Sequence, residues 1–308
     1  MNLAYIIIAY KNLHQVQRLI GCLEDSASQF IVIVDRKTPV QEFEAFHSAV
    51  AGRPHVHVLR RHAIEWGGLS LTLANVICLR ELLERGIPFD YVFSMSGQDY
   101  PIASTAVIRK VLSDAEGNSF IEHMPFPVDR WIDGGQGRIF SWNFILSRKR
   151  VIQLPKATRA RNPVVRFVYA ALNRVIPSRG NLPMRMQPFG GSMHWALSRE
   201  AAEYVDHFLR CHPEYTRRFR WTLVSDEIFF QTILANSPLK QKLISDDMRY
   251  QRWPEPHSPS PSVLTMNDLP ALRRSGKLFA RKFDVCVDAK VLDAIDEMLS
   301  LPAIEGLA

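Results

Sequence analysis

Apolar runs of strand length alternate with stretches of helical spacing through the first third of the chain, and this alternation limits the fold more than any other feature. The strand-type runs, rich in β-branched residues, cover 4–9, 30–34, 56–59 and 91–95. The stretches of helical spacing cover 13–23, 40–50, 71–85 and 106–113. Continuous apolar strands that alternate with helices are typical of a mostly parallel sheet buried on both faces. We therefore predict an α/β fold with a Rossmann-type central sheet flanked by helices.

Polar residues follow three of these strands, in the segments 10–12, 35–37 and 96–101. In parallel sheets ligands bind beyond the carboxyl ends of the strands, so we expect the binding cleft there. No GxGxxG follows a strand and no GxxxxGK[ST] occurs in the sequence. A dinucleotide fingerprint and a P-loop are therefore excluded. A nucleotide would have to bind through other chemistry.

The charge is concentrated in one part of the chain. The formal net charge is +7, which favours anionic partners. No Asp or Glu occurs from Gly134 to Arg199, and within that span the stretch 164–176 has the spacing of an amphipathic helix. Such a segment could bind a membrane surface or a phosphate-bearing, lipid-linked molecule. The alternative is a basic surface insertion without a binding role. No nucleic-acid motif accompanies it. We predict one domain over 1–308, with a basic, acid-free insertion around 134–185.

The cysteines and the hydropathy indicate the cellular compartment in which the protein works. Cys22, Cys78, Cys211 and Cys286 form no CxxC pair, which favours a reducing environment. No uninterrupted apolar run reaches the ~18–20 residues of a membrane span. We expect a cytoplasmic protein, with peripheral contact to the inner face of the membrane as an option.

Ser225-Asp226-Glu227 precedes the apolar run 228–234. Serine is a common N-cap, so we predict a helix with both acids in its first turn. Acids there are stabilised by the helix dipole and need no further role, which is the more economical interpretation. The alternative is that one carboxylate faces a cleft and removes a proton from a bound hydroxyl group.

Two further motifs have both a structural and a functional interpretation. Arg281 and Lys282 lie between two phenylalanines, which indicates an extended segment whose cations either neutralise a diphosphate or form a solvated surface pair. The glycines of Trp66-Gly67-Gly68 allow a positive φ or a close backbone approach, as in a loop against a ligand or a tight turn.

Metal-binding motifs are missing from the sequence. Asp99 ends a strand at the predicted cleft, where many sugar-nucleotide transferases carry an Asp-x-Asp pair, but no DxD occurs in the chain. The histidines are scattered and form no HExxH. We expect no metal and no other cofactor.

Taken together, the segments resemble the core-2/I-branching and peptide O-xylosyltransferase family, inverting glycosyltransferases with a GT-A fold. The resemblance rests on the order of short motifs from about residue 3 to 290. These are the first strand, Asp35-Arg36-Lys37, Trp66-Gly67-Gly68, the segment 96–102, Gly191-Ser192 before Trp195, Ser225-Asp226-Glu227, Trp253 and the segment 278–284. Each motif is weak alone, whereas their shared order is specific.

The resemblance implies a role for each matching position. Glu227 would be the catalytic base, and Lys282 would contact the UDP diphosphate in place of a metal. Trp253, Arg130 and Glu122 would contact the acceptor. Asp35, Arg36, Trp66 and Asp99 fall on the strand ends and loops expected to meet the nucleotide. Animal members carry a further arginine upstream of Asn267; here that stretch is 259–261 and holds no basic residue, so we expect Arg281 to substitute.

The resemblance implies transfer of N-acetylglucosamine or xylose from a UDP-sugar to a hydroxyl of a glycan, a lipid-linked glycan or a peptide. The chain also lacks the membrane anchor of the animal members, which favours a bacterial-type enzyme of polysaccharide synthesis. Two alternatives belong to other classes. One is a non-catalytic protein that binds sugar nucleotides or glycans, and the other is a basic protein that binds membrane surfaces.

Overall fold

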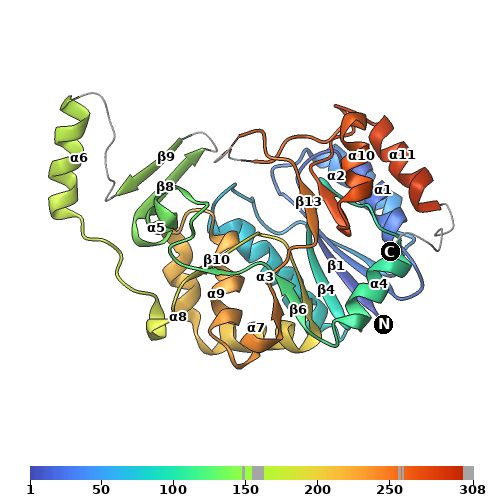
Figure 1. Ribbon diagram of the computed structural model, residues 1–308, viewed down its shortest axis with the longest axis horizontal. Coiled ribbons are helices and arrows are strands. Elements are labelled where there is room, and N and C mark those ends of the chain that lie inside the picture. Colours follow the sequence, from blue (N-terminus) through green and yellow to red (C-terminus); the bar gives the residue numbers. More distant parts are fainter. Residues whose placement is uncertain (148–149, 155–162, 256–257, 259, 301–308) are drawn as a thin grey trace.

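A computed structural model describes residues 1–147, 150–154, 163–255, 258 and 260–300. A seven-stranded sheet forms the centre of the molecule (Figure 1). Its strands, in sheet order, are β12 (Leu243–Ile244), β6 (Ser119–Ile121), β11 (Trp195–Ser198), β4 (Tyr91–Ser96), β1 (Leu3–Ala9), β2 (Ser28–Val34) and β3 (Val56–Leu59). Only β11 runs antiparallel to its neighbours, β4 and β6. The predicted mostly parallel α/β sheet is confirmed.

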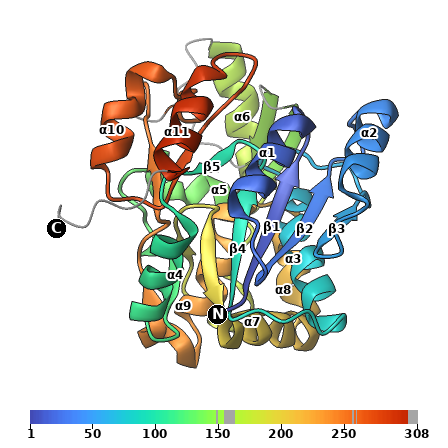
Figure 2. The same cartoon turned by 90° about the vertical axis from the view of Figure 1, so that its right-hand side faces the viewer.

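Helices cover both faces of this sheet (Figure 2). One face packs against α1 (Leu13–Leu23), α2 (Val40–Val50), α4 (Thr105–Asp114), α10 (Leu269–Arg274) and α11 (Lys290–Ser300). The other packs against α3 (Leu69–Glu84), α7 (Arg199–Cys211), α8 (Pro213–Arg218) and α9 (Phe229–Ala235). Alternate residues of β1 enter the two cores: Tyr5 and Ile7 face the first, and Ile6 and Ile8 the second. This double burial explains why the run is apolar at every position.

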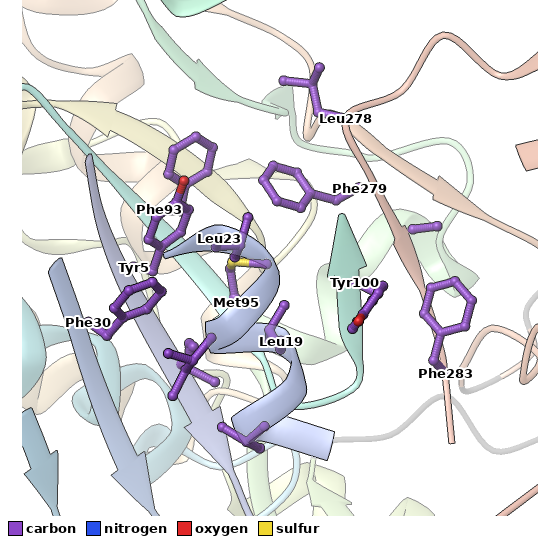
Figure 3. Close-up of a cluster of buried hydrophobic side chains, with 14 of the residues drawn as sticks. Tyr5, Leu19, Leu23, Phe30, Phe93, Met95, Tyr100, Leu278, Phe279 and Phe283 are labelled. Carbon is purple, nitrogen blue, oxygen red and sulfur yellow. The ribbon is translucent and has the colours of Figure 1, made fainter. Parts of the chain in front are cut away.

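Aromatic side chains join a second, three-stranded sheet to the main one (Figure 3). Tyr5 stacks on Phe93 with ring centres 5.2 Å apart, and Phe93 meets the edge of Phe279 at 5.4 Å. Phe279 belongs to the second sheet, formed by β13 (Arg249–Gln251), β14 (Phe279–Arg281) and β5 (Asp99–Pro101). Because β5 follows β4 almost at once, this packing places β14 at the carboxyl end of the main sheet.

The predicted basic insertion contains a hairpin and a helix. The hairpin pairs β8 (Trp142–Ser147) with β9 (Arg150–Leu154), and α6 (Pro163–Val175) confirms the helix predicted over 164–176. In Figure 1 the hairpin and α6 project away from the main sheet. Arg148, Lys149, Lys156, Arg159 and Arg161 lie outside the described residues.

The remaining elements are short. They are the paired strands β7 (Met124–Pro125) and β10 (Phe189–Gly190), the α-helix α5 (Gln136–Phe140), and the 3-10 turns η1 (Ile132–Gly135), η2 (Pro183–Arg185), η3 (Phe219–Trp221), η4 (Ser225–Glu227), η5 (Pro238–Lys242) and η6 (Met266–Asp268).

Within the ranges that the structure describes, no helix has the length and apolar character needed to cross a membrane.

Candidate active site

A cavity of about 1700 Å³ opens at the carboxyl ends of β1, β2 and β4, where the sequence predicted the ligand. Most of the predicted site residues line it: Asp35, Trp66, Glu122, Arg130, Glu227, Trp253, Arg281 and Lys282. Arg36 and Asp99 are not among the lining residues. Arg36 is exposed, whereas Asp99 is fully buried.

Glu227 is carried by a tight turn instead of a helix start. The predicted helix over 225–234 is wrong in its first turn, because η4 spans Ser225–Glu227 and α9 begins only at Phe229. Ser225 does not act as an N-cap; its hydroxyl is buried and hydrogen-bonds to the Thr72 hydroxyl at 2.7 Å. The preceding residue, Val224, adopts φ 52°, a costly conformation for a β-branched residue. The turn is therefore held by contacts with α3.

Two glycines allow other segments to approach this turn. Gly67 has φ +70°, and its carbonyl accepts a 2.7 Å hydrogen bond from the Val224 amide. The Gly191 amide donates to the Glu227 carbonyl at 2.8 Å. A Cβ on Gly191 would lie 1.8 Å from the Glu122 carbonyl oxygen, so only glycine fits there. Gly191 thus brings Glu122 and Glu227 into one wall of the cavity.

Arg138 contacts the Glu227 carboxylate directly. Its Nη1 donates to Glu227 Oε2 at 2.6 Å, and both side chains are partly exposed to the cavity. The Arg138 guanidinium lies over the Trp131 ring, 3.9 Å from its centre. Stacking on an aromatic face fixes the plane of a guanidinium, which here fixes the direction of the carboxylate. Sequence reasoning placed Arg138 only among the basic residues of the insertion.

The adjacent Asp226 has a different environment. The residue is 3% exposed, and its Oδ1 has no hydrogen-bond partner among the described residues. Burial raises the pKa of the Asp226 carboxyl to about 7, and the negative charge of Glu227 adds to the rise. Asp226 therefore keeps its proton to a higher pH than an ordinary aspartate.

This difference gives an expected pH dependence of stability. The folded protein keeps Asp226 protonated up to about pH 7, whereas the unfolded chain releases that proton near pH 4. The stabilisation is therefore complete below about pH 4 and is lost as the pH rises to about 7. Asp226→Asn mimics the neutral acid, so the melting temperature of the variant should rise relative to wild type between pH 5 and 8. Parallel thermal melts over that range measure it; a constant difference would contradict the assignment.

Asp99 organises a buried charge cluster beneath the cavity. It forms ion pairs with Arg281 Nε at 3.1 Å and with Arg249 Nε at 3.7 Å. Asp99 and Arg249 are fully buried as side chains, and Arg281 is 11% exposed. The β-sheet register explains the first contact, because β14 pairs with β5 so that Arg281 lies opposite Asp99. Asp99 therefore positions Arg281 instead of lining the cavity itself.

His194 completes this cluster. Its Nε2 lies 2.5 Å from Arg281 Nη1, and its Nδ1 lies 3.3 Å from the Ser94 carbonyl. A guanidinium can only donate, so Nε2 is the acceptor and Nδ1 carries the proton. Burial, followed by the charges of Arg281 and Arg249, lowers the pKa of His194 well below its usual range. The neutral imidazole thus accepts a hydrogen bond from the Arg281 guanidinium and helps to fix its position.

The predicted acceptor residues all line the cavity. Arg130 binds Glu122 through two hydrogen bonds, 2.7 Å from Nη1 to Oε1 and 2.5 Å from Nη2 to Oε2. Trp253 also lines the cavity and is 51% exposed. An exposed indole can stack on a sugar ring, and a bidentate ion pair can exchange hydrogen bonds with sugar hydroxyls.

Two of the predicted nucleotide residues, Asp35 and Trp66, lie on the loops after β2 and β3, which form one wall of the cavity. Asp35 accepts hydrogen bonds through Oδ1 from the amides of Lys37 at 2.9 Å and Ile64 at 3.2 Å. These bonds fix the loops after β2 and β3. Trp66 lines the same wall and is partly buried. Among the described residues, no group of three or more His, Cys, Asp or Glu side chains is placed to hold a metal ion.

Fold and cavity together define an α/β protein of Rossmann type with a large cavity at the carboxyl ends of its parallel strands. Residues 3–273 match the family model described as "Branch: Core-2/I-Branching enzyme". The chain belongs to this family.

Three curated relatives cover nearly the whole chain at low identity. The beta-glucuronosyltransferase GlcAT14A of Arabidopsis thaliana is 24% identical over 92% of this chain and 61% of its own length. The xylosyltransferase oxt of Drosophila pseudoobscura pseudoobscura is 24% identical over 98% of this chain and 34% of its own. A third relative is the beta-1,3-galactosyl-O-glycosyl-glycoprotein beta-1,6-N-acetylglucosaminyltransferase 3 of Rattus norvegicus. It is 22% identical over 99% of this chain and 69% of its own length. The chain thus spans 34% to 69% of the length of these relatives.

One solved structure aligns at a lower identity than these relatives. The 4-diphosphocytidyl-2C-methyl-D-erythritol synthase of Anaerococcus prevotii aligns over 69% of this chain and 75% of its own, at 9% identity and a TM-score of 0.34. A score this low carries no argument about function.

Proposed function

We propose that the protein is an inverting glycosyltransferase that moves a sugar from a UDP-sugar to an acceptor hydroxyl without a metal ion. One observation carries the proposal: a carboxylate, Glu227, and the two cations Arg281 and Lys282 line a single cavity in a chain of this family. A single displacement needs these groups, one to remove a proton and one to stabilise the departing diphosphate.

The proposed reaction is one concerted substitution. The Glu227 carboxylate takes the proton of the acceptor hydroxyl, and the oxygen forms a bond to the anomeric carbon. The bond from that carbon to the diphosphate breaks, and UDP leaves with the electron pair. Lys282 and Arg281 stabilise the negative charge on UDP, the role that a divalent metal plays in transferases with an Asp-x-Asp pair.

The surroundings of Glu227 suit this role. Arg138, stacked on Trp131, holds the carboxylate in one direction. Its neighbour Asp226 stays protonated to about pH 7, which limits the charge repulsion beside Glu227. Glu227, which lines the cavity and is aimed by Arg138, is the member of the pair proposed as the base.

The names of the relatives support a sugar donor but differ in the sugar. They describe glucuronosyl, xylosyl and N-acetylglucosaminyl transfer. We propose N-acetylglucosamine or xylose as the transferred sugar and a glycan, a lipid-linked glycan or a peptide hydroxyl as the acceptor. Trp253, Arg130 and Glu122 would contact the acceptor, and Asp35 and Trp66 would lie nearest to the nucleotide.

Lys282→Ala should weaken UDP-sugar binding by about 10–150-fold, because a hydrogen bond to a charged group contributes about 1.5–3 kcal/mol. Titration calorimetry with UDP-sugars measures the change. Lys290→Ala, which removes an exposed lysine at the start of α11, is the matched control and should bind like wild type. Equal affinity in both variants would show that the diphosphate binds elsewhere.

The proposed activity is tested by its product. The protein is incubated with UDP-N-acetylglucosamine or UDP-xylose and a panel of acceptor sugars and serine peptides, and the product is analysed by NMR. A β-linked product from the α-linked donor is the expected result. Donor binding without transfer to any acceptor would favour the alternative, a non-catalytic sugar-nucleotide-binding protein.

A further inference from the structure

Helix α6 exposes an apolar surface to solvent. None of its described residues is buried. Phe167 is 76% exposed, Val175 74% and Val168 47%. A large aromatic side chain on a projecting helix is a costly exposure in a protein that stays in water, and it marks a contact surface.

The apolar residues of α6 lie on one side of the helix. The spacing of one, three and four residues places them along one stripe of the helix surface; they are Phe167, Val168, Ala171 and Val175. Arg166 and Asn173, seven residues apart, lie on the other side. The helix is therefore amphipathic, with a short apolar stripe, Arg174 at the edge of that stripe and Arg166 on the opposite side, and it has no acidic residue.

The hairpin beside α6 extends the same kind of surface. Leu146 on β8 is 57% exposed, Phe144 is 37% and Ile152 on β9 is 36%. Leu146 and Gln153 also line the cavity. The hairpin thus reaches the candidate active site, and in Figure 1 α6 lies on the far side of the hairpin from the main sheet.

The positive charge of α6 and the hairpin favours an anionic partner. The sequence holds no Asp or Glu from Gly134 to Arg199, so α6 and the hairpin themselves contribute no acidic residue to this surface. Arg150, Arg166 and Arg174 are all exposed. Apolar side chains near arginines fit the interface of an anionic bilayer. The apolar side chains insert at the level of the acyl chains, and the arginines bind the phosphate groups of the lipids. A protein partner would need an acidic, apolar counterpart of the same shape.

We propose that α6 and the β8–β9 hairpin dock the protein on the surface of an anionic phospholipid bilayer. Helix α6 lies in the plane of the interface, with Phe167 and Val175 inserted and Arg166 and Arg174 at the headgroups. The protein is then held peripherally, with its cavity facing the membrane. The proposal does not depend on the transfer reaction, because it concerns binding alone.

Co-sedimentation with vesicles tests the proposal. We expect the full chain to bind vesicles of phosphatidylglycerol and phosphatidylcholine far more than vesicles of phosphatidylcholine alone. Binding should fall steeply as salt is raised. Arg166→Gln with Arg174→Gln should lower the partition coefficient by about 25-fold, since each cation near the surface contributes about fivefold. Phe167→Ser with Val175→Ser should lower it by at least tenfold.

Val287→Ser is the control, since Val287 is 61% exposed and lies outside α6 and the hairpin. It should bind vesicles like wild type, and all variants should keep the wild-type melting temperature and UDP-sugar affinity. The proposal is overturned if both double variants bind vesicles like wild type, or if the protein binds no anionic vesicles. Dimerisation through α6 without vesicle binding would assign the surface to a second copy instead.

Discussion

Glu227→Gln should lower turnover by roughly 10²–10⁴-fold, the range that general-base catalysis contributes. Glutamine keeps the shape of the side chain and a carbonyl oxygen that can still accept from Arg138, so the cavity should be preserved. The affinity for the UDP-sugar should stay within about twofold of wild type, because the base acts on the acceptor. Single-turnover kinetics with saturating donor and acceptor would measure the chemical step.

The matched control for this variant is Glu44→Gln, which changes an exposed carboxylate on α2 outside the cavity. It should retain full turnover. A further test uses Arg138→Lys, which keeps the charge but loses the planar stacking on Trp131. We expect an intermediate loss of turnover there. If Glu227→Gln were as active as wild type, another group would have to remove the proton, and the proposed mechanism would be wrong.

Asp99→Asn should destabilise the fold by about 3–5 kcal/mol, the cost of removing one partner from a buried ion pair. Arg249 is fully buried and Arg281 nearly so, and both would lose their counter-charge. His194 is neutral, so it cannot compensate for the loss. Urea unfolding followed by circular dichroism measures the change in the free energy of unfolding.

Asp114→Asn serves as the comparison, because Asp114 pairs with Lys110 on the surface of α4 and is 64% exposed. Exposed pairs of this kind contribute about 0.3–0.5 kcal/mol. Similar stabilities for the two variants would contradict the role assigned to the buried cluster. A weakened UDP-sugar affinity in the Asp99 variant under native conditions would show in addition that the cluster positions Arg281.

The parallel core of the fold could be predicted from the sequence because its strands are buried on both faces. Every residue of β1 enters one core or the other, so the run is apolar without interruption and its ends are marked by polar residues. The helix over 13–23 was predicted with its observed ends for a related reason, since its apolar residues follow the helical period.

The turn that carries Glu227 could not be predicted in this way. The residue types of Ser225-Asp226-Glu227 suit a helix start, but long-range contacts override that local preference. Ser225 hydrogen-bonds to Thr72 on α3, 153 residues away in the sequence. The Val224 amide is bound by Gly67. Tertiary contacts of this kind leave no periodic signal in the sequence.

The sequence predicted residues that share one cavity, but it did not predict the contacts that hold them. Most of the residues that motif order predicted line the cavity, including Glu227 and Lys282. Arg138 was missed as a partner of Glu227, because the pair is separated by 89 residues and no local pattern links them. His194 was missed as well. The sequence places His194 next to Trp195, at the start of a buried strand. Many histidines with a purely structural role occupy such a position, so the position alone did not indicate a contact with Arg281.

Donor binding in the absence of metal tests the central claim most directly. The purified protein is melted with EDTA present and with a panel of UDP-sugars, each at a hundredfold excess over its dissociation constant. One UDP-sugar should stabilise the fold by about 2.7 kcal/mol at that excess, and Lys282→Ala should abolish most of the shift. Stabilisation that appears only with added Mn²⁺, or none with any UDP-sugar, would contradict the proposed metal-free diphosphate site.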